Sequence, residues 1–224
     1  MGGQLTYAVD IVFCIDTTGS MGELIAQVKG HATAFEQELK KVMDAKGKTI
    51  DALRVRVVPY RDFYADGGAG WNPSQFFTLP KDNDSFRACV NSLAADGGGD
   101  EPECGLEALV AAIRSDWTKT GDKRRQVIVL YTDASSHPLE KAAASKPTGY
   151  PDDMPANFND LTDLWEGQTV NRSGKRLIMF APDAKPWSDI ANHWTNVVHH
   201  TSKAGKGLVD VDYNAILDVI ANSV

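Results

Sequence analysis

The sequence VDIVFCIDTTGSMGELI, residues 9–25, passes from an almost unbroken apolar run into a cluster of acid, hydroxyl and glycine residues. An apolar run of this kind is typical of a strand that is buried on both faces, as in a parallel sheet. The polar residues Asp16, Thr18 and Ser20 must then lie where this strand ends. We therefore expect the polar cluster to hold a ligand at the end of the strand.

Similar apolar runs recur along the chain, and segments with helical periodicity separate most of them. The predicted strands are residues 7–15, 53–60, 126–131, 176–181 and 196–200. The predicted helices are residues 22–44, 85–94, 103–117, 159–169, 187–193 and 213–221. The segment FFTL, residues 76–79, follows the second strand too closely for a crossover helix, so an antiparallel edge strand is expected there. The pattern predicts an α/β fold with a Rossmann-like, doubly wound, mostly parallel sheet and one antiparallel edge strand.

The composition predicts one globular domain over residues 1–224, since 42% of the residues are hydrophobic and 24% are charged. The net charge of −7 argues against a nucleic-acid or anionic-membrane surface, because either needs a concentrated basic patch. No stretch is long enough to span a bilayer, so we predict no membrane insertion. The three cysteines are odd in number and lack zinc-like spacing, which favours free thiols and a cytoplasmic location.

Acid and hydroxyl residues are concentrated at the predicted junctions between strands and helices. In open α/β sheets, ligands bind beyond the carboxyl ends of the strands, so a site is expected at these junctions. The segments are DTTGSMGE (16–23), YRDFYADGGAGWNPSQ (60–75), DGGGDEPECG (96–105) and TDASSHP (132–138). Because the junctions share one edge of the predicted sheet, we expect their side chains to converge.

The alternation of Asp16, Thr18 and Ser20 places three oxygen-bearing side chains on one side of a chain that stays extended. One carboxylate and two hydroxyls suit Mg²⁺ or Mn²⁺ and suit no thiophilic metal. A site with so few negative charges leaves its cation under-neutralised. Such a cation would accept an external carboxylate.

Most of these residues also have simpler explanations, which stay open at this point. Ser20 with Glu23 fits a capping box for the first helix, and Asp100 with Glu103 fits the same device for a later helix. Asp133, which follows a buried strand, fits ordinary turn chemistry. A shared site is favoured because these three groups, at Ser20, at Asp100 and at Asp133, all occur at junctions predicted to lie on one edge of the sheet.

The motif DTTGSM, residues 16–21, resembles the DxSxS signature of von Willebrand factor type A (VWA) domains. The segment VLYTDAS, residues 129–135, resembles the third metal loop of that family. In VWA domains the signature belongs to a metal-ion-dependent adhesion site that holds Mg²⁺. The resemblance implies the VWA fold, with Asp16, Thr18 and Ser20 on the cation and Asp133 acting through water or directly.

The middle loop, GGGDEPECG, is similar to that of integrin β-subunit I-like domains, in which a Glu binds the adhesion-site metal. This likeness implies that Glu103 binds the same cation. It also implies a second cation, such as Ca²⁺, bound by Asp100 and Asp62. Asp62 has an alternative role as the ion-pair partner of Arg61 or Arg54.

The residues and the resemblance together predict a protein-binding module in which bound Mg²⁺ (or Mn²⁺) accepts an Asp or Glu carboxylate of a partner protein. Long loops at residues 60–75 and 134–157 surround the expected site, and loops of this length are usually functional or disordered. Within them, Trp71, Tyr64 and His137 are predicted to contact the partner. The alternative is that these side chains fold back over the domain.

Two other functions were weighed against protein binding. One is a Mg²⁺-dependent, phosphatase-like hydrolase with Asp16 as nucleophile, but Thr18 stands where such an enzyme usually has its second acid. The motifs GxxxxGK[ST], GxSxG and HExxH are absent from the sequence. The other is an interaction domain without a metal. We predict a protein that is not an enzyme.

Overall fold

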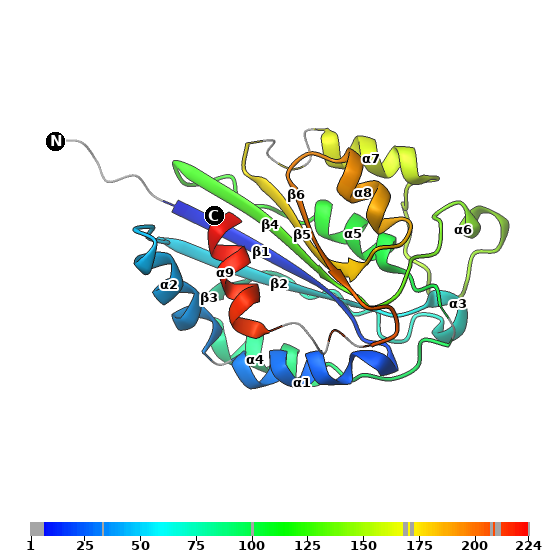
Figure 1. Cartoon of the computed structure of the whole chain (residues 1–224), viewed down its shortest axis with the longest axis horizontal. Coiled ribbons are helices and arrows are strands. Elements are labelled where there is room, and N and C mark those ends of the chain that lie inside the picture. Colours follow the sequence, from blue (N-terminus) through cyan, green and yellow to red (C-terminus); the bar gives the residue numbers. More distant parts are fainter. Residues whose placement is uncertain are drawn as a thin grey trace.

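A six-stranded sheet forms the centre of the molecule, with the strand order β3-β2-β1-β4-β5-β6 (Figure 1). The computed structural model describes residues 7–32, 34–99, 101–167, 170, 173–206, 208 and 212–223. The strands are β1 (Tyr7–Asp16), β2 (Ala52–Tyr60), β3 (Phe77–Leu79), β4 (Lys123–Tyr131), β5 (Lys175–Pro182) and β6 (Val197–Ser202). β3 pairs with β2 in antiparallel orientation, and the other neighbours pair in parallel. The predicted fold class, including the antiparallel edge strand, is confirmed.

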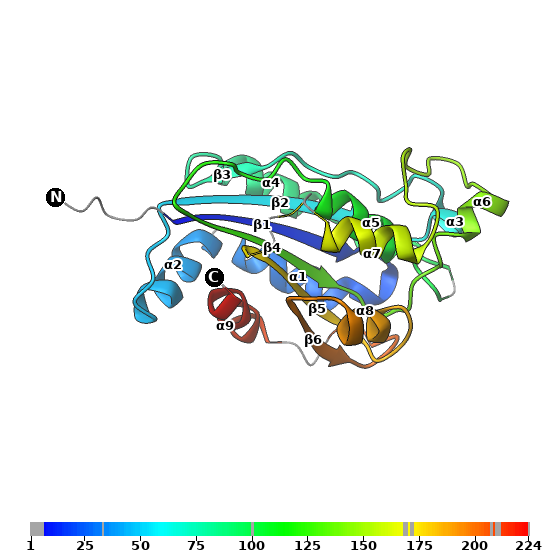
Figure 2. The ribbon, with the colours of Figure 1, turned by 90° about the horizontal axis from the view of Figure 1, so that it is seen from above.

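The apolar run of β1 is buried on both faces because helices cover both sides of the sheet. Ile11 and Phe13 belong to one core cluster, and Val12 and Cys14 belong to the other. The first cluster is covered by α1 (Gly22–His31), α2 (Phe35–Ala45), α4 (Asn83–Ser92) and α9 (Tyr213–Ser223). The second is covered by α5 (Gly105–Ile113), α7 (Phe158–Glu166) and α8 (Trp187–His193). Figure 2 shows the sheet between α1, α2 and α9 on one side and α5 and α7 on the other. Within the described ranges, no helix has the length and hydrophobicity needed to cross a bilayer.

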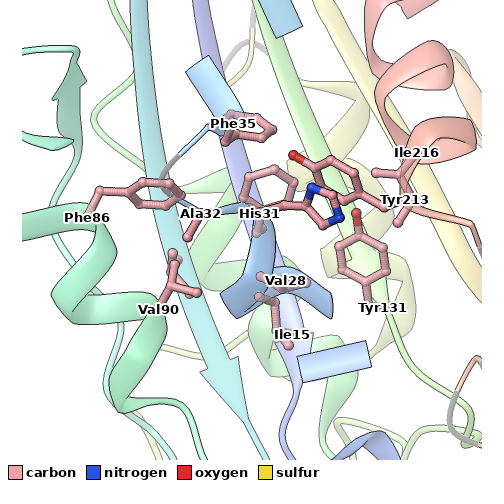
Figure 3. Close-up of a pocket in the computed structure, with 12 residues that line it drawn as sticks. Ile15, Val28, His31, Ala32, Phe35, Phe86, Val90, Tyr131, Tyr213 and Ile216 are labelled. Carbon is pink, nitrogen blue, oxygen red and sulfur yellow. The ribbon is translucent and has the colours of Figure 1, made fainter. Parts of the chain in front are cut away.

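The single helix expected over residues 22–44 was wrong, because the chain forms two helices there, α1 and α2. The break lets His31 meet two other helices: its ring stacks on Tyr213 of α9 at 3.7 Å, and its Nδ1 lies 3.4 Å from Glu38 Oε2 of α2. In a continuous helix, seven residues would separate His31 from Glu38 by about 10 Å along the axis. Figure 3 shows the stacked rings beside an apolar cavity between the sheet and α1, α4 and α9.

Two short helices, α3 (Phe63–Asp66) and α6 (Lys141–Ala144), lie within the long loops that the sequence predicts. Each is a single turn, so no apolar periodicity indicates it. In Figures 1 and 2, α3 and α6 lie side by side at the end of the sheet to which the carboxyl ends of the parallel strands point. The helix expected from residue 103 begins at Gly105, and Glu103 forms an isolated bridge with Ser136.

Candidate metal centre

Three segments that are distant in the sequence meet beyond the carboxyl ends of β1 and β4. They are the first loop (residues 16–23), the middle loop (96–105) and the third loop (132–138). The Gly19 N–H donates to Gly97 O at 3.3 Å, which joins the first loop to the middle loop. The Glu103 N–H donates to Ser135 O at 3.0 Å, and the His137 N–H donates to Glu103 O at 2.8 Å, which joins the middle loop to the third loop. The structure therefore brings all three predicted site loops to one edge of the sheet.

Asp16 is fully buried at the end of β1, and both of its carboxylate oxygens accept hydrogen bonds. Oδ1 accepts from the Thr18 N–H at 2.9 Å and from the Thr18 hydroxyl at 2.6 Å, and Oδ2 accepts from the Thr132 hydroxyl at 2.8 Å. Burial raises the pKa of Asp16 to about 6, although these hydrogen bonds oppose the rise. Sequence reasoning missed Thr132. Its place at the end of a predicted strand, directly before Asp133, is the signal that could have indicated it.

Ser20 and Asp133 are in direct contact although 113 residues separate them, since the Ser20 hydroxyl donates to Asp133 Oδ1 at 2.9 Å. Ser20 lies inside a short 3-10 helix, η1 (Gly19–Met21), and α1 has no side-chain cap. The capping box of Ser20 with Glu23 is therefore not formed. The hydroxyl of the first loop points to the acid of the third loop.

Glu103 is buried among other acids. The residue is only 5% exposed, and its Oε2 has no hydrogen-bond partner in the part of the chain that the structure describes. Burial raises the pKa of Glu103 to about 9, and nearby carboxylates add to the rise. These carboxylates belong to Asp16, Asp62, Asp66 and Asp133. The ionised form of Glu103 is therefore disfavoured by the acids around it.

Gly98 allows the middle loop to approach the first loop closely. Its φ is +101°, and a Cβ at this position would lie 2.7 Å from Thr18 Cβ and 2.9 Å from Glu103 Oε1. The Glu103 carboxylate therefore lies close to Thr18, across a space that only glycine leaves open. The capping-box explanation of Glu103 does not hold, because α5 begins at Gly105 and has no side-chain cap. Asp100 lies outside the described residues.

The oxygen atoms of this cluster fit a small, hard divalent cation. The carboxylates of Asp16 and Glu103 and the hydroxyls of Thr18 and Ser20 are ligand types that Mg²⁺ and Mn²⁺ prefer. The partnerless Oε2 of Glu103 is an oxygen that such a cation would satisfy. Across the described ranges, no group of three or more His, Cys, Asp or Glu side chains is arranged to hold a metal ion. A cation site at this edge would therefore depend on the hydroxyl groups.

Asp62, which was expected to bind a second cation, accepts hydrogen bonds from its own chain. It is the N-cap of α3, where its Oδ1 accepts from the Tyr64 N–H at 2.8 Å. The same oxygen lies 3.3 Å from His137 Nε2 and 3.4 Å from Cys104 Sγ. The structure therefore places Asp62 beside the cluster, with three donors at its Oδ1.

The alternative ion pairs of Asp62 do not match the arginine contacts that the structure shows. Arg54 makes two hydrogen bonds to Asp10, of 2.9 and 2.6 Å. Arg61 donates to backbone carbonyl groups just after β1 and α4, at 3.1 and 2.9 Å. Neither arginine therefore pairs with Asp62 in these contacts. Which segment lies next to each arginine depends on the fold, and the sequence alone does not indicate it.

The three residues predicted to contact a partner pack against the domain. The rings of Tyr64 and His137 meet edge to face with centroids 4.8 Å apart, and His137 is 8% exposed. Trp71 is half-buried, and its ring lies 5.3 Å from that of Phe63. Burial lowers the pKa of His137, although Asp62 opposes the shift, so the ring is neutral at pH 7. The part that these residues play in partner binding stays a prediction.

A second buried acid, Glu107, is predicted to make the stability of the domain depend on pH. Its Oε1 accepts from the Tyr150 hydroxyl at 2.7 Å, and burial raises its pKa from 4.5 to about 7. Because the folded-state pKa is the higher one, the unfolded chain ionises first, and the stability of the domain falls as the pH rises from 4.5 to about 7. Glu107→Gln should remove the loss and be more stable than the wild type by about 3 kcal/mol at alkaline pH.

Urea unfolding of Glu107→Gln and wild type, at acid and at mildly alkaline pH, measures this difference. The variant keeps an oxygen that can accept from Tyr150, so the advantage should shrink when the pH is below the unfolded value. Asp152→Asn is the control, because that acid is 91% exposed and should show no such trend. A difference between Glu107→Gln and wild type that is the same at every pH would contradict the prediction.

The fold and the site together define an α/β domain whose oxygen-rich loop cluster lies at the carboxyl edge of a parallel sheet. The sequence profile described as "von Willebrand factor A domain" matches residues 10–149, which is more than half of the chain. The chain therefore belongs to the von Willebrand factor A domain family.

Curated relatives are similar to this chain over part of their length. The human von Willebrand factor A domain-containing protein 7 is 36% identical over 110 residues, which cover 49% of this chain and 11% of that protein. The alpha-protein kinase vwkA of Dictyostelium discoideum is 27% identical over 159 residues, which cover 70% of this chain and 23% of the kinase. The chain thus spans a small part of the curated relatives that it matches.

Solved structures share the fold. The vWF domain of the type V pili tip protein Mfa5 from Porphyromonas gingivalis has a TM-score of 0.52 at 16% identity, over 98% of this chain and 96% of that one. The pilus adhesin SpaC from Lactobacillus rhamnosus GG has a TM-score of 0.55 at 12% identity, over 98% of this chain and 31% of that one. At these identities the likeness shows the fold alone.

Proposed function

We propose that this chain is a protein-binding module, a single domain over residues 1–224, that works through a divalent cation, Mg²⁺ or Mn²⁺. The cation would be held by Asp16, Thr18 and Ser20 of the first loop and by Glu103 of the middle loop, with Asp133 of the third loop behind them. An Asp or Glu side chain of a partner protein would supply the remaining ligand.

The buried, partnerless oxygen of Glu103 is the observation that carries this proposal. Burial without a hydrogen bond and the neighbouring carboxylates both disfavour the ionised form of Glu103. A divalent cation would neutralise the cluster and give this oxygen a partner. The hydroxyls of Thr18 and Ser20 add ligands without adding charge, so Asp16 and Glu103 would balance the formal charge of the cation and its open coordination position would accept an external carboxylate. Family membership supports the same function, since VWA domains are typically adhesion or protein-interaction modules.

Glu103 has, in this proposal, the part that an integrin-like middle loop implies. A second cation such as Ca²⁺ would need Asp62 and Asp100 together. Asp62 already accepts hydrogen bonds from its own chain, and Asp100 lies outside the described residues. The proposal therefore includes one cation.

We propose no catalytic activity for this site. The phosphatase alternative needs a second acid two residues after the nucleophile, whereas this position is Thr18, whose hydroxyl donates to Asp16. One curated relative is named a kinase, but this chain covers only 23% of it. The hydrogen bonds of Asp16 favour a carboxylate that is held in place.

The cytoplasm remains the location that we propose for the protein. All three cysteines are free thiols, and Cys14 and Cys104 are buried. A reducing compartment keeps thiols in this state.

Selection from a random peptide library tests the proposed function without a known partner. Peptides retained by the immobilised protein in millimolar Mg²⁺ and released by EDTA should contain Asp or Glu. Changing that residue to Asn or Gln should weaken binding at least tenfold, a loss of about 1.4 kcal/mol. Asp16→Ala is the control and should retain none of these peptides. Peptides that bind equally well in EDTA, or that lack acids, would contradict the function.

A further inference from the structure

Lys141, His137 and Asp62 form a hydrogen-bonded chain beside the proposed cation site. His137 Nε2 lies 3.3 Å from Asp62 Oδ1, and Lys141 Nζ lies 3.1 Å from His137 Nδ1 and 3.2 Å from His137 Nε2. The ammonium group therefore contacts both nitrogens of the imidazole, and one of them, Nε2, is also the nitrogen that faces Asp62. Asp62 precedes α3, and Lys141 lies in α6, so the chain connects the two long loops around the site.

The Lys141 ammonium group is held at this position by a second contact. It lies 3.7 Å from the centre of the Tyr64 ring, which is a cation–π contact. Tyr64 belongs to α3, and its ring also meets that of His137. The contacts between α3 and α6, which lie side by side in Figures 1 and 2, thus include a positive charge.

Asp62 Oδ1 already faces three donors. It accepts from the Tyr64 N–H at 2.8 Å and from the Cys104 thiol at 3.4 Å, and His137 Nε2 lies 3.3 Å away. A carboxylate oxygen offers about two lone pairs. A metal ion could bind this oxygen only by displacing donors of the protein itself.

The charge of Lys141 acts on the carboxylate cluster beyond Asp62. Burial is the main reason that the pKa of Glu107 is raised, while Asp62 adds to the rise and Lys141 opposes it. The lysine therefore supplies positive charge where the cluster of acids continues past the proposed Mg²⁺ site. A second metal ion would supply the same charge at this place.

We infer that Lys141, acting through His137, is a built-in cation that holds Asp62 in place of a second metal ion. The inference rests on the proposed function, and it adds that the module binds a single divalent cation. Lys141 and His137 are positioning residues: they hold the loop that carries Tyr64 against the third site loop. These two loops beside the site are then held together without Ca²⁺.

The number of bound cations tests the first part of this inference. Mn²⁺ titration followed by electron paramagnetic resonance should show one equivalent for the wild type, one for Asp62→Asn and none for Asp16→Ala. An equivalent that is lost in Asp62→Asn, or retained in Asp16→Ala, would overturn the inference and leave cation-dependent binding intact. If the wild type binds no Mn²⁺, the proposed function fails, and the melting experiment alone decides the inference.

Melting temperatures in EDTA test the role of Lys141. Lys141→Met should lower the melting temperature of the wild type by about 3 °C or more, and that of Asp62→Asn by much less. Lys141→Arg keeps the charge and the contact with Tyr64, so it should restore most of the loss. Lys146→Met, which removes the exposed ion pair with Asp152 in the same loop, is the control and should change little. Equal losses in both backgrounds, or no rescue by Arg, would overturn the inference.

Discussion

Glu103→Gln is expected to raise the melting temperature of the protein in EDTA and to remove most of the stabilisation that Mg²⁺ gives the wild type. At pH 7 the buried carboxyl group stays protonated in the folded state, with a pKa of about 9, while the unfolded chain ionises near 4.5. Keeping the group protonated at pH 7, when its unfolded-state pKa is 4.5, costs about 3 kcal/mol of stability, or roughly 5–10 °C for a chain of this size. Gln keeps the shape of the side chain but carries no charge, so the penalty and the cation ligand disappear together.

The pH dependence of stability gives a second check on Glu103. Because the folded-state pKa is the higher one, the stability of the wild type in EDTA falls as the pH rises from 4.5 to about 9, and the variant lacks this part of the fall. Calorimetry in EDTA and in Mg²⁺ measures both effects. Glu101→Gln, which removes an exposed acid two residues earlier, should change neither. If Glu103→Gln melts below the wild type in EDTA, or keeps the full Mg²⁺ increment, Glu103 is not part of a cation site.

Gly98→Ala is expected to destabilise the domain by about 3 kcal/mol or more and to abolish the response to Mg²⁺. The first cause is the backbone, since a φ of +101° is rare for a residue with a side chain. The second is the new methyl group, which would lie 2.7 Å from Thr18 Cβ and 2.9 Å from Glu103 Oε1. The first and middle site loops would have to move apart.

Two other glycines separate these two causes. Gly47 also has a positive φ, +69°, but a Cβ there meets nothing within 4 Å, so Gly47→Ala introduces backbone strain alone. Gly30 lies in α1 with open space around it, so Gly30→Ala should be neutral or stabilise by up to about 1 kcal/mol. Urea unfolding and Mg²⁺ titration of the three variants measure the effects. Equal losses for Gly98→Ala and Gly47→Ala, with the Mg²⁺ response intact, would refute the close approach.

The fold class and the loops of the candidate site could be predicted from the sequence because they follow from local patterns. The apolar run before Asp16 is buried along β1, and the helix predicted over residues 187–193 has those bounds as α8. The predicted strand-end loops meet at one edge because parallel strands place their carboxyl ends together. Strand and helix periods depend on residues a few positions apart, and the sequence displays these directly.

The tertiary structure decided which partner each side chain meets. From the sequence, Ser20 fits a helix cap and Asp62 fits an arginine or a cation, but the fold places Ser20 against Asp133 and Asp62 against His137. The break between α1 and α2 likewise accompanies the contact of His31 with α9. Such contacts join residues that are far apart in the chain, so they depend on how the loops pack over the sheet edge. The sequence by itself determined the class of fold and the chemistry of the site residues, and the packing of the loops decided which oxygen or nitrogen atom each of them faces.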